Sequence, residues 1–399
     1  MRVGEALDHA ARPLGDVPVL VADTGLDLDH PDLQAQVLSP LPAGSDFIGN
    51  ACQPGNGDTN PDDDPNHNGC SAHGSLVAGL LGATWDNNVG GAGVAPNATF
   101  IPFRTCWDDD QCYEFVQADA MKRAIEDYGA RVVSMSWLSG SPMEDDFKKV
   151  ITQHPNTLFV SIPSGNGGAT NADPDASERL PCSLNSPNVI CVSTSSPNDG
   201  LDCGDYGKTL VDVAVPTQNS ITTNDGGGFV PTGCATSFAS PTAAGIATIL
   251  FGIAPEATAS QVRQAIIDGA RPVPAWSGKS VSGGIADAAG AVDALQSALG
   301  IVPGSPPGTP PSGDNSPPDT TITKGPDDVV HGKKAKFKFK SDDPDATFAC
   351  KLDHGQYKSC TSPYKVKHLD SGRHKLKVVA TDAAGNNDLS PATIRFKVA

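Results

Sequence analysis

The sequence predicts an α/β domain, a mostly parallel twisted sheet with helices on both faces, followed by a small all-β sandwich. Over residues 1–300, short apolar runs alternate with segments of helical periodicity, which is typical of parallel strands joined by helical crossovers. Residues 301–318 are dominated by Pro, Gly and Ser, which indicates an exposed linker. Residues 319–399 alternate polar and apolar side chains, which favours a sandwich of short strands.

The elements of the first domain follow from these patterns in chain order. Apolar runs are expected to form strands at 17–22, 98–103, 132–137, 158–162, 189–192 and 210–214. Helical spacing predicts helices at 113–128, 145–153, 258–268 and 286–299, and another that begins near His73. In the last domain, alternating runs predict strands at 335–340, 347–352, 375–380 and 393–398.

One long apolar stretch follows Ser237. Residues 239–250 contain no acid or base, so they predict a fully buried helix. Pro241 falls in its first turn, where a missing N–H costs little. Ser237 therefore lies at a buried helix N-terminus, where backbone N–H groups favour developing negative charge. A nucleophile and its oxyanion would be stabilised there, although a plain serine N-cap is the alternative.

Charge is unevenly distributed along the 399 residues, whose net charge is −18. Up to residue 319 there are 13 Lys and Arg against 37 Asp and Glu, a net −24, and afterwards 15 against 9, a net +6. This change of sign supports a domain boundary. No apolar run approaches the roughly 20 residues that cross a bilayer, and nothing indicates nucleic-acid binding. We expect a monomer.

Ten cysteines occur in close pairs without a Cys-x-x-Cys motif, which favours disulfides and an oxidising compartment. Reduced core thiols are the alternative, and zinc is disfavoured because no histidine lies at ligand spacing. The expected pairs are Cys52–Cys70, Cys106–Cys112, Cys182–Cys191, Cys203–Cys234 and Cys350–Cys360.

We therefore expect a secreted or cell-surface protein. The first nine residues lack the apolar segment of a signal peptide. Either the export segment is absent from this sequence or export does not occur, and the cysteines favour the former.

Three polar residues have the right chemistry for nucleophilic catalysis. Asp23 follows a predicted strand, while His73 and Ser237 each begin a predicted helix. Serine needs an imidazole to take its proton, and a carboxylate to fix the imidazole tautomer. Taken singly, Asp23 would be a strand-end turn residue and His73 an ordinary residue near a helix start.

Four motifs in order resemble those of the subtilisin-like serine peptidases. They are Val21-Ala-Asp-Thr-Gly-Leu26 with His30-Pro-Asp-Leu33, His73-Gly-Ser-Leu-Val-Ala-Gly79, Gly93-Val-Ala-Pro-Asn-Ala98, and Ala235-Thr-Ser-Phe-Ala-Ser-Pro241. The resemblance covers roughly residues 15–300. It implies an endopeptidase without a catalytic cofactor, in which Asp23 orients His73, His73 is the general base, and Ser237 attacks the peptide carbonyl.

The same resemblance assigns the rest of the site. Asn166 would donate its side-chain N–H to the oxyanion, although Asn in Gly-Asn-Gly-Gly is also a common turn residue. Ser136, Trp137, Leu138 and Ser139 would pair with the extended substrate. Departures from the family pattern are Ala235 for Gly, Phe238 for Met, Ser75 for Thr and Leu138 for Gly. Leu138 would narrow the pocket floor or fill the S4 region.

The resemblance also bears on metal binding and on processing of the chain. Asp32 and Asn87 match positions that bind structural calcium in this family, and an exposed turn is the alternative for each. The acidic runs at 62–64 and 108–110 are expected to be solvated loops. No inhibitory prodomain precedes Asp23, so the chain would be a trimmed mature enzyme.

The last domain resembles an immunoglobulin-like bacterial repeat, on Thr347-Phe-Ala-Cys-Lys-Leu-Asp353, Cys360-Thr-Ser-Pro363 and Ala380-Thr-Asp-Ala-Ala-Gly-Asn386. Lys334, Lys336, Lys338 and Lys340 would share one strand face. That face could bind an anionic cell-wall polymer or proteoglycan, but a solvated edge strand that discourages aggregation is the favoured interpretation.

Two other functions compete with the peptidase. A catalytically inactive binding or adhesion protein could keep the fold, and Ala235 is the main reason to consider it. An esterase or other acyl hydrolase is disfavoured because Gly-x-Ser-x-Gly is absent around Ser237. Proteins or peptides are the expected substrates.

Overall fold

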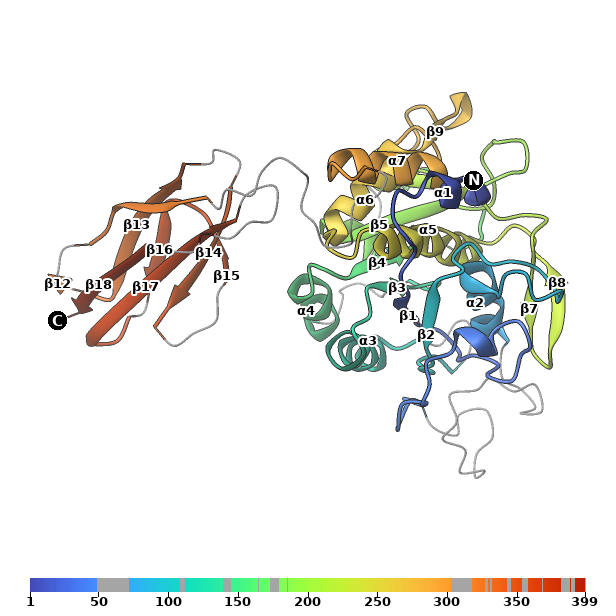
Figure 1. Ribbon diagram of the computed structural model, residues 1–399, viewed down its shortest axis with the longest axis horizontal. Coiled ribbons are helices and arrows are strands. Elements are labelled where there is room, and N and C mark those ends of the chain that lie inside the picture. Colours follow the sequence, from blue (N-terminus) through green and yellow to red (C-terminus); the bar gives the residue numbers. More distant parts are fainter. Residues whose placement is uncertain are drawn as a thin grey trace. The chain divides into compact units, whose positions relative to one another are not determined.

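The computed structural model divides the chain into two compact units (Figure 1). Of the described residues, the first comprises Met1–Ala298 and Val302, and the second comprises Leu299–Ile301 and everything from 318 onward. The structure describes residues 1–48, 72–107, 112–138, 145–163, 165–172, 179–184, 186–302, 318–326, 329–330, 332–342, 346–353, 358–367, 369–381, 388 and 392–398. Most of the predicted linker and both acidic runs at 62–64 and 108–110 lie outside these residues.

The first unit is built on a mostly parallel sheet, as predicted, which has eight strands rather than the six that the sequence indicated. In spatial order its strands are β2 (Ala98–Ile101), β1 (Val17–Val21), β3 (Val132–Ser134), β4 (Leu158–Ser161), β5 (Val189–Ser195), β6 (Val213–Pro216), β10 (Gly284–Ile285) and β9 (Arg271–Pro272). All neighbours pair in parallel except β9, which runs antiparallel to β10.

The strand predicted at 210–214 begins three residues late. Asp212 is buried, and its carboxylate accepts the Cys191 N–H at 2.9 Å and pairs with Arg263 at 2.5 Å. A buried carboxylate needs such partners. The Asp212 N–H still donates to the Cys191 carbonyl at 2.8 Å, but the Cys191 N–H goes to the Asp212 side chain rather than to a strand carbonyl, and the strand starts only at Val213.

Helices cover both faces of the sheet. Alternate strand residues such as Leu20, Val133 and Phe159 join a core cluster with α3 (Glu114–Tyr128) and α4 (Asp145–Gln153). The opposite face is covered by α5 (Ala239–Ile253). A polar contact joins this helix to the sheet, since the Ser240 hydroxyl lies 3.1 Å from the Ser134 hydroxyl of β3. Successive side chains of a strand point to opposite faces, so a sheet buried on both sides needs apolar runs of this kind.

Every residue of α5 is buried, as predicted. A short 3-10 turn, Thr236–Phe238, precedes it and contains Ser237. Among the described helices, one segment, Thr236–Ile253, is long and apolar enough to cross a membrane by length and composition alone. That segment is 89% buried inside the protein, as expected for the central helix of a domain core.

The remaining helices are α1 (Val3–His9), α2 (His73–Gly82), α6 (Ala259–Asp268) and α7 (Ala288–Ala298). A hairpin of β7 (Ile221–Asn224) and β8 (Gly228–Pro231), like α1, was not predicted. The hairpin is fixed by α2, since the hydroxyls of Thr222 and Thr223 donate to the carbonyls of Leu76 and Ser75 at 2.6 Å each. Its polar threonines gave little apolar periodicity.

The second unit is all-β. One sheet has the order β11 (Thr320–Lys324), β13 (Lys334–Ser341), β16 (Tyr364–Lys367), and the other the order β12 (Val329–Val330), β18 (Ala392–Val398), β17 (Gly372–Thr381), β14 (Thr347–Leu352), β15 (Lys358–Cys360). Phe337 and Phe339 of the first sheet share one hydrophobic cluster with Leu376 and Phe396 of the second. The immunoglobulin-like arrangement stays a prediction.

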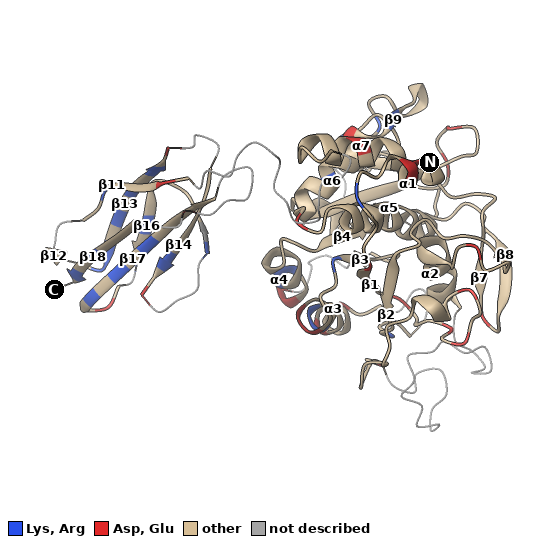
Figure 2. Ribbon diagram, viewed as in Figure 1, with Lys and Arg blue, Asp and Glu red and all other residues tan. Residues whose placement is uncertain are grey.

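Figure 2 shows that Lys and Arg line the strands of this second unit. Four disulfides join pairs that the spacing predicts, Cys106–Cys112, Cys182–Cys191, Cys203–Cys234 and Cys350–Cys360. Cys52 and Cys70 lie outside the described residues.

Candidate active site

Asp23 stands just beyond the carboxyl end of β1 and is held there by its backbone. Its carbonyl accepts the N–H groups of Thr105 and Cys106 at 2.9 and 3.0 Å. Its carboxylate accepts the Thr24 N–H at 2.9 Å. The residue is only 3% exposed, so the carboxylate is fixed in position and largely shielded from water.

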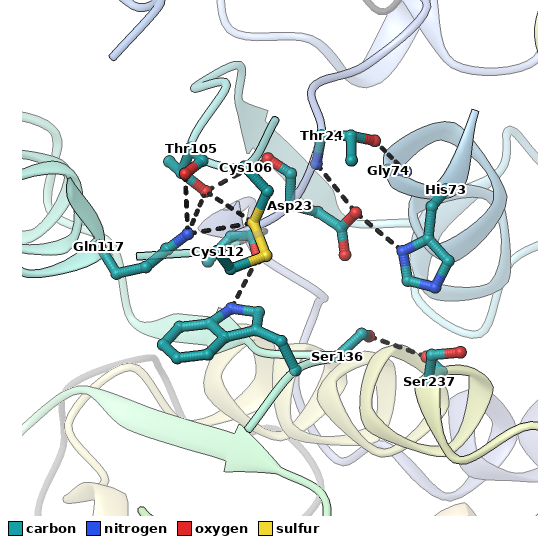
Figure 3. A network of polar contacts seen from close by, with 12 residues as sticks. Asp23, Thr24, His73, Gly74, Thr105, Cys106, Cys112, Gln117, Ser136 and Ser237 are labelled. Carbon is teal, nitrogen blue, oxygen red and sulfur yellow. Dashed lines mark hydrogen bonds and ion pairs between the residues drawn. A yellow bond between two sulfur atoms is a disulfide. The ribbon is translucent and has the colours of Figure 1, made fainter. Parts of the chain in front are cut away.

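His73 is the first residue of α2 and faces Asp23 (Figure 3). Its Nδ1 lies 2.8 Å from Asp23 Oδ1. Because an ionised carboxylate only accepts hydrogen bonds, Nδ1 carries the proton. Nε2 is then the nitrogen that can receive a proton from a nucleophile.

A glycine brings this helix start close to Asp23. The Gly74 N–H donates to Thr24 Oγ1 at 2.9 Å. A Cβ on Gly74 would lie 1.9 Å from the carbonyl oxygen of Gly25, which no side chain could tolerate. The His-Gly pair of the motif therefore serves packing as well as chemistry.

Ser237 lies across the imidazole from Asp23 (Figure 3). The Ser136 hydroxyl donates to the Ser237 carbonyl at 2.8 Å, and three residues later the Ser240 hydroxyl donates to the Val160 carbonyl at 3.0 Å. These contacts tie the turn before α5 to the loop after β3 and to β4. Ser237 is half-buried, so its side chain is accessible.

A pocket of about 610 Å³ contains His73, Ser237 and Asn166 in its wall. Its other lining residues are Leu76, Cys112, Ser136, Trp137, Leu138, Ile162, Gly165, Ala235, Thr236 and Phe238. Residues separated by up to 165 positions in the chain thus meet at one edge of the sheet, where ligands of open α/β sheets bind.

The Asn166 side chain is oriented by Thr236, a residue that the sequence did not single out. Asn166 Oδ1 accepts the Thr236 N–H at 2.7 Å and its hydroxyl at 3.0 Å. Since two donors hold the amide oxygen, the amide NH₂ is the end that can donate to a ligand. The position of Thr236 directly before the serine was the available signal.

The segment that is expected to pair with substrate has residues of differing exposure. Trp137 is 6% exposed, and its indole N–H donates to the Ala22 carbonyl at 3.0 Å, so it mainly supports the strand before Asp23. Leu138 is 38% exposed and offers an apolar surface to the pocket. Ser139 lies outside the described residues.

A second support for Asp23 comes from Gln117, which the sequence analysis treated only as part of a helix. Gln117 is fully buried, and its Nε2 donates to the carbonyl and the hydroxyl of Thr105 at 3.1 and 2.9 Å. Thr105 in turn donates its N–H to the Asp23 carbonyl. Buried polar groups of this kind lie outside any apolar pattern and give no periodic signal.

Asp32 and Asn87, the two residues of the calcium hypothesis, are hydrogen-bonded to each other. Asn87 Nδ2 donates to Asp32 Oδ1 at 2.6 Å, and Asn87 Oδ1 accepts the Val89 N–H at 3.0 Å. Asp32 is fully buried, and its Oδ2 has no hydrogen-bond partner among the residues that the structure describes. A buried, unpartnered carboxylate oxygen is costly, and it fits an oxygen ligand for a hard cation.

Another group of potential metal ligands, Asp202, Cys203 and Cys234, does not suit a metal ion. Asp202, Cys203 and Cys234 lie within ligand distance of one another, but the two cysteines form a disulfide. A disulfide sulfur is not a thiolate ligand.

The fold and the site together define the class of protein: a mostly parallel α/β domain in which a buried Asp and a half-buried His are hydrogen-bonded near a serine that precedes a buried helix. The model of the subtilase family (peptidase S8) matches residues 15–301, and the chain belongs to that family, a class of serine-type endopeptidases.

Several relatives carry peptidase names. A thermophilic serine proteinase of Bacillus sp. (strain AK1) is 31% identical over 58% of this chain and 51% of its own length. Thermitase of Thermoactinomyces vulgaris is 29% identical over 62% of this chain and 78% of its own length. An extracellular protease of Xanthomonas campestris is 29% identical over 69% of this chain and 51% of its own length. The chain thus spans about half the length of two of these relatives.

Solved structures show the same fold. The prenylagaramide maturation protease PagA matches with a TM-score of 0.56 at 19% identity, over 74% of this chain and 98% of its own. A structure of the subtilase cytotoxin SubAB matches with a TM-score of 0.57 at 18% identity, over 73% and 94%.

Proposed function

We propose that this chain is a serine endopeptidase that hydrolyses peptide bonds through an acyl-enzyme on Ser237. One observation carries the proposal: His73, which is hydrogen-bonded to Asp23 at 2.8 Å, lines the same pocket as Ser237. With the Nδ1 proton held by Asp23, Nε2 accepts the hydroxyl proton as Ser237 attacks the carbonyl carbon. His73 then donates that proton to the leaving amine, and a water molecule hydrolyses the ester by the same route.

Negative charge develops on the substrate carbonyl oxygen as the tetrahedral intermediate forms. The Asn166 amide and the Ser237 backbone N–H are the donors we assign to it. The contacts of Asn166 with Thr236 support this assignment, because a pre-oriented amide need not reorganise during the reaction.

Substrate would bind in extended form against the backbone of Ser136–Leu138. The exposed Leu138 side chain supports a subsite for an apolar residue of the substrate. Its relatives include an extracellular protease and a cell wall-associated protease. We propose that this protein also acts outside the cell.

For the rest of the chain we keep the domain boundaries 1–300, 301–318 and 319–399 and an immunoglobulin-like sandwich for the last. The hydrophobic cluster that both sheets share supports the sandwich. We further propose that Asp32 and Asn87 help to bind a structural calcium ion, which would supply no catalytic chemistry.

A fluorophosphonate probe tests the proposed nucleophile, because it labels only an activated serine. We expect the wild-type chain to be labelled and to degrade casein, and Ser237→Ala to do neither. Ser260→Ala, which removes an exposed serine of α6, is the matched control and should be labelled like wild type. Equal labelling of wild type and Ser237→Ala would reject the assignment, and absent casein turnover would favour an inactive binding protein.

A further inference from the structure

The strands of the second unit carry cations and no acid. From residue 320 onward, fourteen of the fifteen Lys and Arg residues lie within strands, whereas none of the nine Asp and Glu residues lies within a described strand. Figure 2 shows this separation, with blue along the arrows and red in the connections. Solubility alone does not require it, because surfaces normally mix both signs.

Seven lysines form one surface on the three-stranded sheet, which we call the lysine face. They are Lys324 of β11, Lys334, Lys336, Lys338 and Lys340 of β13, and Lys365 and Lys367 of β16. All seven are exposed. Alternate residues of a strand are about 6.6 Å apart, and neighbouring strands about 4.8 Å, so the four β13 lysines form a row roughly 20 Å long.

The register sets these charges against one another. Lys334 lies opposite Lys367, and Lys336 lies opposite Lys365. Lys338 lies opposite Lys324. Like charges directly across a strand pair destabilise a sheet, and no carboxylate of the described residues pairs with any of the seven ammonium groups. The folded domain therefore retains a repulsion that a bound anion would relieve.

Protection of a sheet edge does not explain this surface. Lysines on an edge strand discourage aggregation, and the sequence favoured that interpretation for β13. The structure contradicts it, because β13 is the central strand, with β11 on one side and β16 on the other. Its backbone groups are already paired, so they need no such protection.

We propose that the lysine face binds a linear anionic polysaccharide whose carboxylate or sulfate groups repeat along the chain. A straight row of evenly spaced cations suits a polymer better than a compact ligand. The described residues of this face include no exposed aromatic side chain, and so lack the stacking platform of single-stranded nucleic-acid sites. The disulfides indicate an oxidising, extracellular setting, where such glycans occur.

The test uses the full-length chain and fluorescent polymers, with binding followed by anisotropy. Dextran sulfate and polygalacturonate separate a sulfate from a carboxylate ligand, and neutral dextran is the negative control. We expect binding to at least one charged polymer, weakened by salt, and none to neutral dextran. Replacing Lys334, Lys336, Lys338 and Lys340 by Thr, which favours strands, should weaken binding at least about tenfold.

A matched variant carries the same loss of charge on the other sheet. It replaces Arg373, Lys375, Arg395 and Lys397 by Thr. These four also oppose one another across β17 and β18, but they span only two alternate positions of each strand, about 6.6 Å. They are therefore too short a row for a polymer, and the affinity of this variant should stay within about twofold of wild type. Equal losses in both variants would reduce the effect to net charge and overturn the proposal. Tighter binding of oligo-dT than of either charged polysaccharide would also overturn it.

Folding is checked in the same variants. Removing the β13 lysines relieves cross-strand repulsion, so the melting temperature of the second unit should be unchanged or higher. If that variant does not fold, the pair Lys365→Thr and Lys367→Thr removes the opposing charges on β16 and must weaken binding too. Peptide hydrolysis should be unaffected in all of them, so the outcome is independent of the proposed peptidase.

Discussion

At the scale of single residues, Asp23 and Asn166 are each held in place by residues that take no part in the proposed reaction. Thr24 and Thr105 fix Asp23 through backbone and side-chain contacts, and Thr236 fixes the Asn166 amide. Preorganised groups of this kind stabilise a transition state without the cost of reorienting dipoles. The supporting threonines should therefore matter for rate as well as for folding.

Replacing Asn166 by Ala should lower kcat by about 10²–10³ with little change in KM, the range known for loss of the equivalent donor in subtilisin, a member of this family. The amide would act mainly on the oxyanion of the transition state, so substrate binding should change little. Steady-state kinetics on a peptide substrate measure both constants.

The companion variant Thr236→Val removes the hydroxyl contact to Asn166 but keeps the N–H contact. Its kcat should fall far less, by about tenfold at most, since one net hydrogen bond is lost. Unchanged kcat in Asn166→Ala would remove this residue from the oxyanion site.

At the scale of elements, the site depends on how closely secondary structures approach. The start of α2 lies against the turn after Asp23 because Gly74 has no side chain. Farther along, Gly79 allows β7 to approach α2, since a Cβ there would lie 2.1 Å from Thr223 Oγ1. Close contacts of this kind cannot relax without moving backbone.

Replacing Gly74 by Ala should therefore displace His73 from Asp23. Its Cβ would meet the Gly25 carbonyl, so the helix start must shift. A displacement of about 1 Å costs up to about 10²-fold in rate, and overpacking lowers stability by roughly 1–3 kcal/mol. Kinetics and thermal melting measure the two effects.

Gly4→Ala is the control, because a Cβ on that glycine of α1 meets no atom within 4 Å. This substitution should leave activity unchanged and stability equal or slightly higher. Wild-type activity in Gly74→Ala would show that the helix start is more adaptable than its packing indicates.

At the scale of the whole molecule, each unit has its own hydrophobic core, and the two differ in charge and architecture. An ion bound to one unit should therefore stabilise that unit and leave the other unchanged. The buried Asp32, with one carboxylate oxygen unpartnered, lies in the first unit.

Chelation should consequently lower the melting temperature of the first unit alone, by several degrees, since bound calcium stabilises the folded state by mass action. Calorimetry with and without excess chelator, followed by calcium addition, measures the shift and its reversal. Asp32→Asn should melt lower than wild type and be insensitive to chelator. An identical wild-type curve in chelator would count against a calcium site.

Local sequence patterns were sufficient to predict most strands and helices of the first unit, the buried helix after Ser237, four of the disulfide pairs and the all-β character of the end of the chain. They missed α1, the β7–β8 hairpin, β9 and β10. The features that were predicted depend on the local periodicity and composition of the sequence, which can be recognised without knowing how the chain folds in three dimensions. The candidate residues Asp23, His73 and Ser237 were identified from short motifs for the same reason.

Which residues far apart in the chain come into contact could be seen only in the three-dimensional structure. It showed Thr236 holding Asn166, Gln117 supporting Thr105, and β13 in the middle of its sheet. It also placed Trp137 chiefly in the core and moved the start of β6 to Val213. Such pairings depend on chain topology and on the need of buried polar groups for partners, and neither has a period that a sequence displays.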